Sequence, residues 1–341
     1  MKKALITWKF TLTAILLTVI LSACAGNGSS SVSSSPQESP PISKSEAGEA
    51  SAESVEIENM GETLRFSEAP KRAVTLNQHA TEVMLALGLE ASMAGTAYLD
   101  DSILPEYKEK YESIPVLSDK YPSKEIFLAA SPDFAYAGWQ SAFTEETLGS
   151  RAELADQGVG TYIQESSNKP KPTLEDVYQD ILNIGKIFRV EERAEALVDG
   201  IRSDLENIQT QIGPVDQPLK IFVYDSGEEK AFTAANTYLT SLINQVGGKN
   251  IFDDIDKGWA EVSWEEVVNR DPDVIVIVDY GDETKEQKKE RLMGMASLAD
   301  VKAIQNERFV VLPLSAAAEG IRAPIALQTL AAGLYPDKVN P

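Results

Sequence analysis

One stretch in the middle of the chain determines its architecture: residues 191–212 read EERAEALVDGIRSDLENIQTQI. Its apolar residues recur at steps of one, three or four, at Ala194, Leu197, Val198, Ile201, Leu205, Ile208 and Ile212. This spacing predicts a helix with one apolar face, roughly 33 Å long, ended by Gly213-Pro214. Such a helix is suited to spanning two halves of a chain. The alternative is an ordinary crossover helix within one larger sheet.

Both flanks of this helix alternate strand-like and helix-like segments. Before it, we expect strands at residues 73–76, 93–96, 134–137 and 160–164. After it, we expect strands at residues 219–224, 274–278 and 309–312, of which VIVIV at 274–278 suits a strand covered on both faces. Thr173 and Asp176 have the spacing of a capping box and predict a further helix before the long one. The pattern predicts an α/β fold with two Rossmann-like parallel-sheet lobes, a long backbone helix joining them and a ligand cleft between them.

The N-terminus carries an export signal. A mostly apolar run at residues 10–21 follows Lys2, Lys3 and Lys9. The run is short for a membrane span but suits a secretory signal peptide. The following Leu21-Ser22-Ala23-Cys24 resembles a bacterial lipobox and contains the only cysteine of the chain. We therefore expect a signal peptide at 1–23 and lipidation of Cys24. The alternative is a plain signal peptide or a short anchor.

The expected domain organisation follows from these boundaries. Residues 24–56 are rich in serine and poor in large apolar groups, so they predict a disordered tether behind the lipidated cysteine. We assign residues 57–172 to an N-terminal α/β lobe, 173–213 to linking helices and 214–341 to a C-terminal α/β lobe. The lipid anchor would hold this body on the extracellular or periplasmic side of the cell membrane.

Composition excludes several classes of function. A net charge of −22 argues against nucleic-acid binding, which requires a basic face. One cysteine and one histidine exclude a disulfide framework and a cage of several histidines. The sequence has neither a Gly-x-Ser-x-Gly elbow nor a phosphate-binding glycine loop, so we expect no enzymatic activity. A lipid-anchored adhesin or sensor, or a surface hydrolase, remains as the alternative of another class.

A short pattern occurs once in each half of the chain. Residues 125–133 read EIFLAASPD and residues 265–273 read EEVVNRDPD, so each has a glutamate seven residues before a Pro-Asp pair. Each pair leads into an expected strand, and each glutamate falls in the first turn of a short helix. The helix dipole alone favours an acid there. The matching positions in two lobes nevertheless indicate a shared role for Glu125 and Glu265.

Together, the lipobox, the serine-rich tether, the two lobes, the long helix and the paired segments resemble the class III substrate-binding proteins of ABC importers. The resemblance covers about residues 57–336. It implies a monomeric receptor without a permanent cofactor, which captures a ferric siderophore, haem, vitamin B12 or a bare metal ion and delivers it to a membrane permease driven by a cytoplasmic ATPase. It also implies that Glu125 and Glu265 dock on permease arginines, although the adjacent Glu266 makes the second assignment less secure.

Ligands of open α/β sheets bind beyond the carboxyl ends of the strands. That rule nominates ligand-contacting residues in the first lobe: Asn77, Gln78, His79, Tyr98, Lys120, Tyr121, Trp139 and Gln140. In the second lobe it nominates Asp225, Phe232, Trp259, Tyr280, Ser315, Glu319 and Arg322. Several are aromatic and suit a large ligand with apolar or planar surface. Lys120 and Arg322 could meet an anionic group, and the alternative for Arg322 is a pair with Glu319.

The histidine count bears on the cargo. A bare zinc or manganese site needs several soft ligands, and His79 is the only histidine, so a bare transition metal is disfavoured. A chelated metal needs no protein ligands. We therefore expect a ferric siderophore or a similar iron complex as cargo, with a bare metal ion, haem or cobalamin as alternatives. No residue is assigned as a metal ligand.

Overall fold

The computed structural model describes residues 54–340, so the expected signal peptide, Cys24 and all but the end of the tether lie outside the described residues. The described part begins with an antiparallel pair of strands, β1 (Val55–Asn59) and β2 (Glu62–Phe66). Strand β1 thus starts two residues inside the stretch that the sequence assigned to the tether. Its buried Ile57 and the buried Phe66 of β2 join the main apolar core, which explains why these residues are ordered as a strand pair.

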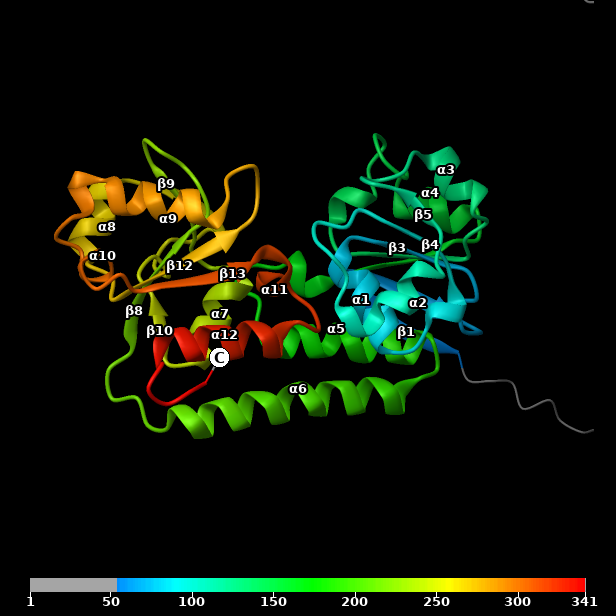
Figure 1. The fold of residues 1–341 in the computed structure, drawn as a ribbon. Coiled ribbons are helices and arrows are strands. Elements are labelled where there is room, and N and C mark those ends of the chain that lie inside the picture. Colours follow the sequence, from blue (N-terminus) through cyan, green and yellow to red (C-terminus); the bar gives the residue numbers. More distant parts are fainter. Residues whose placement is uncertain (1–53, 341) are drawn as a thin grey trace, which may run out of the picture. The chain divides into compact units, whose positions relative to one another are not determined.

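The first lobe is built on a five-stranded parallel sheet with the strand order β5-β4-β3-β6-β7 (Figure 1). The strands are β3 (Ala73–Leu76), β4 (Met93–Ala97), β5 (Val116–Ser118), β6 (Phe134–Ala137) and β7 (Gly160–Ile163). Its helices are α1 (Gln78–Ala86), α2 (Lys108–Glu112), α3 (Lys124–Ala129) and α4 (Arg151–Asp156). Four of the five strands were predicted; the short edge strand β5 was not.

Two helices follow the first lobe. Helix α5 (Leu174–Ile187) starts with the predicted capping box of Thr173 and Asp176, and α6 spans Glu191–Ile212 as predicted. Gly213 ends α6 with a φ of 68°, a conformation that glycine adopts without strain. The helices pack closely where Gly185 faces Ala194, since a Cβ at Gly185 would lie 2.4 Å from the Ala194 side chain. Helix α6 runs beneath both sheets in Figure 1.

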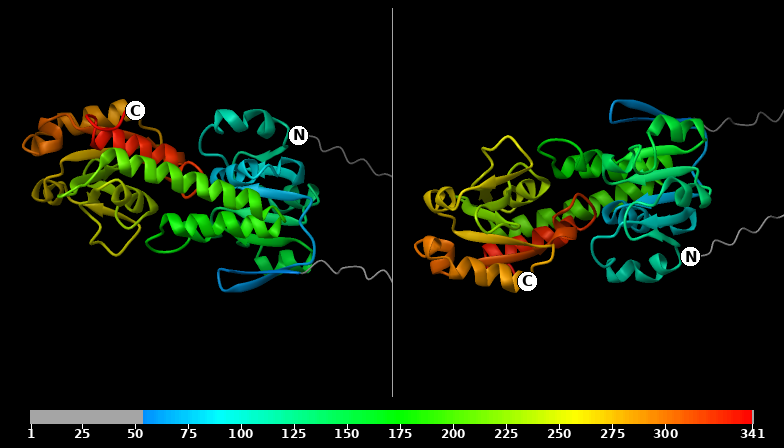
Figure 2. Two further views of the ribbon diagram at one scale, coloured as in Figure 1. Left: turned by 90° about the horizontal axis from the view of Figure 1, so that it is seen from below. Right: turned by 90° about the horizontal axis from the view of Figure 1, so that it is seen from above.

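The second lobe is built on a four-stranded parallel sheet with the strand order β10-β8-β12-β13. The strands are β8 (Leu219–Tyr224), β10 (Gly248–Asn250), β12 (Val274–Asp279) and β13 (Phe309–Pro313), beside an antiparallel pair of β9 (Ala231–Ala234) and β11 (Trp259–Val262). Its helices are α7 (Tyr238–Gln245), α8 (Trp264–Arg270), α9 (Lys285–Gly294), α10 (Lys302–Gln305), α11 (Leu314–Ala317) and α12 (Ala323–Leu334). Helix α12 lies along α6 (Figure 2).

The core confirms the predicted fold class. Residues 274–278 are almost fully buried, as expected for a central strand covered on both faces. One apolar cluster contains side chains of both sheets together with α5, α6 and α12, so the linking helices belong to the same core as the lobes. Within residues 54–340, no helix combines the length and the apolar character that a membrane crossing requires.

Candidate functional site

A cavity of about 680 Å³, including its open mouth, lies where the two lobes face each other. Twelve described residues line it: Gln78, His79, Asp100, Trp139, Thr237, Leu239, Trp259, Leu314, Ser315, Ala317, Ala318 and Glu319. The part of it that a water molecule can enter is about 140 Å³, which is below the range of roughly 300–1,000 Å³ that is usual for small-molecule sites. The wall is largely apolar and has one tryptophan from each lobe.

The fold explains why these residues meet. In the first lobe, Gln78 and His79 follow β3, Asp100 follows β4 and Trp139 follows β6. In the second lobe, residues 314–319 follow β13. All of these segments leave the carboxyl ends of parallel strands, where ligands of open α/β sheets bind.

The cavity brings together six of the residues that the sequence nominated: Gln78, His79, Trp139, Trp259, Ser315 and Glu319. It also contains six that the sequence did not nominate: Asp100, Thr237, Leu239, Leu314, Ala317 and Ala318. Asp100 follows a predicted strand and could have been found by the same rule as Tyr98. The alanines and leucines carry no such signal, because the same residue types fill every apolar core.

The other nominated residues lie outside the cavity lining. Four of them form a cluster in the first lobe, where the Lys120 ammonium lies 4.4 Å from the Tyr98 ring centre and the Tyr98 and Tyr121 rings are 4.8 Å apart. The Tyr121 hydroxyl donates to Asn77 Oδ1 at 3.1 Å. In the second lobe, the Phe232 ring stacks on the lining residue Trp259, with 5.6 Å between ring centres.

Three further nominated side chains make no part of the wall. The exposed Gln140 begins a short turn that is held by its backbone N–H, which donates to Asn168. Asp225 accepts a hydrogen bond from the neighbouring Ser226 hydroxyl at 2.8 Å. Tyr280 is 45% exposed, and its carbonyl accepts from the buried Lys288 ammonium. None of these three contacts joins the lobes.

His79 is held tightly in the wall of the cavity. Its ring contacts Trp139 edge to face at 5.5 Å, and its Nε2 lies 3.3 Å from the Ser167 hydroxyl. Two glycines make room for it, because a Cβ on Gly138 would collide with the ring and one on Gly320 would lie 3.1 Å from the His79 Cβ. Burial lowers the pKa of His79 to about 4, and a hydrogen bond with the Gly138 backbone, which raises the pKa, only partly opposes this shift. The imidazole is therefore uncharged at neutral pH.

We expect NMR to show this directly, because the chain has a single histidine and its imidazole signals need no assignment. The imidazole carbon–proton signals should titrate with a midpoint near pH 4. The unfolded chain binds this proton at about pH 6.5, so His79 lowers stability as the pH falls from about 6.5 to about 4. A midpoint near 6.5 in the folded protein would contradict the burial of His79.

The acids of the cavity are also affected by burial. Burial raises the pKa of Glu319 to about 7, and hydrogen bonds from its own backbone and from the Ser167 side chain oppose the rise. Burial raises the pKa of Asp100 as well, although the charge of Lys120 opposes it. Near neutral pH, the Glu319 carboxyl is thus only partly ionised.

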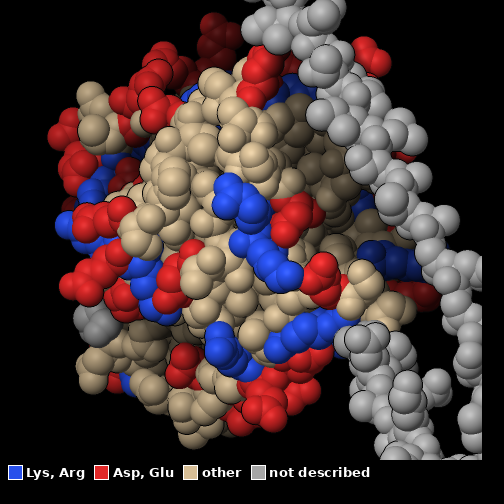
Figure 3. Space-filling model, turned by 90° about the vertical axis from the view of Figure 1, so that its right-hand side faces the viewer, with Lys and Arg blue, Asp and Glu red and all other residues tan. Residues whose placement is uncertain are grey.

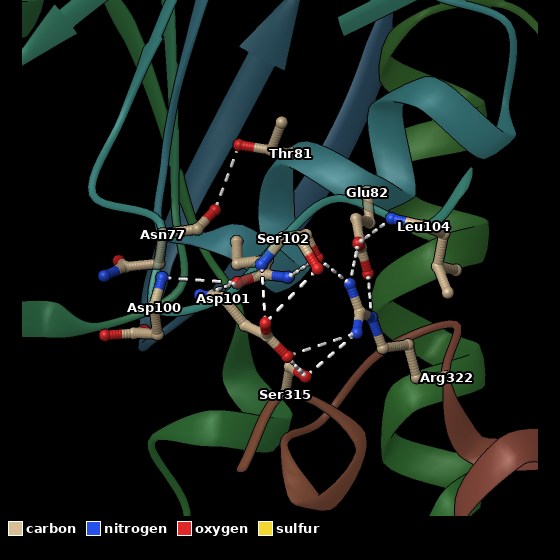
Figure 4. A network of polar contacts seen from close by, with 10 residues as sticks. Asn77, Thr81, Glu82, Asp100, Asp101, Ser102, Leu104, Ser315 and Arg322 are labelled. Atoms are coloured by element: carbon tan, nitrogen blue, oxygen red, sulfur yellow. Dashed lines mark hydrogen bonds and ion pairs between the residues drawn. The ribbon is translucent and has the colours of Figure 1, made fainter. Parts of the chain in front are cut away.

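A polar network beside the cavity joins the lobes (Figure 4). Arg322 of the second lobe donates from Nε and Nη2 to the Glu82 carboxylate at 2.8 and 2.5 Å, and also donates to the Ser102 carbonyl at 2.6 Å. Ser315 donates to Asp101 Oδ2 at 2.7 Å. Both charged partners are buried, with Glu82 1% and Arg322 8% exposed. The sequence had proposed cargo or Glu319 as partner of Arg322; the structure instead pairs it with Glu82, and Arg322 is not in the cavity wall.

Gln78 completes this network from within the first lobe. Its Oε1 accepts from the backbone N–H of Asp101 at 2.8 Å, and its Nε2 donates to the Ser102 carbonyl at 3.0 Å. The loop after β4 is thus held by Gln78 from one lobe and by Arg322 and Ser315 from the other. That loop carries the lining residue Asp100.

Glu125 and Glu265 lie where the sequence placed them. Each is exposed in the first turn of its short helix, α3 or α8, and both helices lie on the side of the body away from α6 (Figure 1). Ser123 and Ser263 cap the two helices through their side chains. The neighbouring Glu266 instead completes the capping box of α8, so its carboxylate is engaged with Ser263.

The Pro-Asp pairs that follow these glutamates have the same structural role in both lobes. Asp133 accepts from the backbone N–H groups of Lys71 and Arg72 at 2.8 and 2.9 Å, just before β3. Asp273 accepts from the backbone N–H of Lys220 in β8 at 2.9 Å. Each aspartate therefore ties the start of one strand to its neighbour, which gives a structural reason for this half of the repeated pattern.

Two further observations concern a basic surface patch and a cluster of metal-binding side chains. On the end of the body drawn in Figure 3, Lys and Arg side chains lie among Asp and Glu side chains rather than in a basic patch. Among residues 54–340, no group of three or more His, Cys, Asp or Glu side chains is arranged to hold a metal ion.

Comparison with curated proteins gives relatives over most of the chain. The chain is 24% identical over 328 residues to an uncharacterized ABC transporter substrate-binding lipoprotein, YvrC, of Bacillus subtilis. The alignment covers 95% of this chain and 96% of the relative. It is 28% identical over 211 residues to the vitamin B12-binding protein of Pectobacterium carotovorum. That alignment covers 61% of this chain and 71% of the relative.

Solved structures agree with the fold. A periplasmic binding protein from Veillonella parvula matches with a TM-score of 0.77 and 34% identity, over 84% of this chain and 99% of that one. An ABC-type Fe3+-hydroxamate transport protein from Saccharomonospora viridis matches with a TM-score of 0.67 and 20% identity, over 82% of this chain and 98% of that one. The family model of the periplasmic binding proteins matches residues 74–316, which contain both sheets and most of the cavity. These findings confirm the resemblance to the class III substrate-binding proteins of ABC importers, and the chain belongs to the periplasmic binding protein family.

Proposed function

We propose that the chain is the extracellular substrate-binding lipoprotein of an ABC importer, anchored through Cys24, and that its cargo is a chelated metal, specifically a ferric siderophore or similar iron complex. The observation that carries the proposal is the cavity between the lobes, with Trp139 on one wall and Trp259 on the other. Large aromatic faces suit the apolar and planar surface of a chelate.

The lining also argues for a metal that arrives already chelated. His79 is the only histidine, its ring is buried against Trp139, and its second contact is the Ser167 hydroxyl. The remaining acids of the wall, Asp100 and Glu319, supply too few ligands for a bare transition metal. A chelate brings its own ligands and needs only shape and surface complementarity.

Delivery is the second half of the proposal. Glu125 and Glu265 are exposed on helices at one side of the two lobes, and they would fix the register of the loaded protein on a bilobed permease. A cytoplasmic ATPase would then drive release and transport. The proposed role involves no chemical change of the cargo, and we expect no turnover.

A fluorescence titration tests the binding step. We would titrate the purified protein with ferric siderophores, ferric citrate, haem, cobalamin, and bare zinc, manganese and iron, and follow tryptophan emission. We expect saturable quenching by one ferric chelate at sub-micromolar concentration, which Trp139→Ala and Trp259→Ala should each weaken at least tenfold. Tight binding of a bare ion, or no response to any chelate, would contradict the proposal. Tight binding of haem or cobalamin would contradict the siderophore as cargo and retain the receptor role.

A further inference from the structure

The charges of the residues that line the cavity bear on which ligands it can bind. Among the twelve described residues of the lining, two are acidic and none is lysine or arginine. The two acids, Asp100 and Glu319, come from opposite lobes. His79 cannot supply a positive charge at neutral pH, because burial lowers its pKa to about 4. The wall is therefore neutral to negative.

Two cations near the cavity, Arg322 and Lys120, interact with other groups of the protein. Arg322 is bound in the buried pair with Glu82, and its Nη1 lies 3.8 Å from Asp101. Lys120 lies over the Tyr98 ring, outside the lining, and its charge acts on Asp100. A negatively charged ligand would find no free cation among the residues that line the cavity.

This distribution of charged residues favours uncharged and cationic ligands over anionic ones. An anion that leaves water for a largely apolar site needs a charge-assisted partner, and an unpaired buried charge is unfavourable by several kcal/mol, on the order of a thousandfold in affinity. An uncharged chelate does not lose this solvation energy. A cationic chelate would gain from Asp100 and from the ionised fraction of Glu319. Unpaired like charges are a common means of excluding the wrong ligand.

Building on the proposed function, we infer that the cavity selects metal chelates without net negative charge, the class to which uncharged and cationic ferric trihydroxamates belong. It rejects anionic chelates, such as ferric catecholates and ferric citrate, and planar ligands that carry free carboxylates. Asp100 and Glu319 are then the residues that determine this specificity, while Trp139 and Trp259 provide the contact surface that both classes would share.

Calorimetric titration of the full purified protein tests the inference. The probes are ferrichrome, which is uncharged, ferrioxamine B, which is cationic, and ferric enterobactin and ferric citrate, which are anionic. We expect at least one of the first two to bind at least a hundredfold more tightly than either anionic chelate.

Variants locate the selection in the cavity. Asp100→Lys is expected to raise the affinity for an anionic chelate at least tenfold and to weaken ferrioxamine B. Glu319→Gln should weaken ferrioxamine B while leaving ferrichrome within about threefold. The matched control is Asp216→Lys, which makes the same charge change on an exposed loop before β8. An equal effect of this control would mean that net charge, rather than the cavity, selects the ligand, and would overturn the inference.

The outcomes separate this inference from the proposed function. An anionic chelate that binds most tightly, and that Trp139→Ala weakens, would overturn the charge selection but retain the chelate receptor. If none of the four ferric chelates binds, the proposed function fails and the inference fails with it.

Discussion

Replacement of Glu82 by alanine is expected to lower the free energy of unfolding by about 3–5 kcal/mol, the range observed when one partner of a buried ion pair is removed. Arg322, which is 8% exposed in the intact protein, would lose the carboxylate that accepts two of its hydrogen bonds. Its remaining partners are the Ser102 carbonyl, the Ser315 hydroxyl and the half-exposed Asp101. Urea denaturation followed by circular dichroism measures the change.

Two controls separate charge burial from loss of packing. Glu56→Ala removes one partner of the ion pair with Arg65, whose side chains are more than half exposed, and should change the midpoint little. The double variant Glu82→Leu with Arg322→Met removes both charges and should recover most of the lost stability, because an apolar pair avoids the unpaired charge. Equal destabilisation by Glu82→Ala and Glu56→Ala would contradict the description of this pair as a buried link between the lobes.

The double variant Glu125→Ala with Glu265→Ala is expected to abolish transport and to leave cargo affinity unchanged. Both carboxylates are exposed on short helices, and neither lines the cavity. Their removal takes two charges from the surface proposed to meet the permease, where charge complementarity sets encounter and register. Cellular uptake of a radiolabelled ferric chelate measures transport, and fluorescence titration of the purified variant measures affinity.

The matched control is the double variant Glu192→Ala with Glu206→Ala, which removes two exposed acids from α6. It makes the same change in net charge on another part of the surface and should transport normally. Loss of cargo binding in the Glu125/Glu265 variant would refute the docking role. Normal uptake by that variant would place the permease contact elsewhere.

Much of the fold could be predicted from the sequence because burial leaves a periodic signal. Residues 274–278 are apolar throughout since both faces of β12 are covered, and α6 keeps its apolar residues on one face because only that face packs. Strand β5 could not be predicted. It is a three-residue edge strand in which only Val116 and Leu117 are apolar, and this run is too short to identify a strand. Strand β1 starts at the end of the serine-rich stretch, where composition concealed it, and β2, which follows that stretch, was not predicted either.

The location of the site could be predicted from the sequence, but the partners of its side chains could not. The strand-end rule found His79 and Trp139 because each follows a strand directly. It could not find the partner of Arg322, since Glu82 is 240 residues away and lies on a helix of the other lobe. Nor could it separate the wall of the cavity from its surroundings. Tyr98 follows a strand as closely as Trp139 does, yet it packs against Lys120 and Tyr121 outside the lining.

The most direct test of a chelate receptor is to locate the metal. We would crystallise the protein with the ferric chelate that binds most tightly and measure anomalous scattering at the iron edge. The account predicts one strong iron peak inside the cavity, with the chelate in contact with Trp139 of the first lobe and Trp259 of the second. An iron peak outside this cavity, or iron bound directly by protein side chains without the chelate, would contradict it.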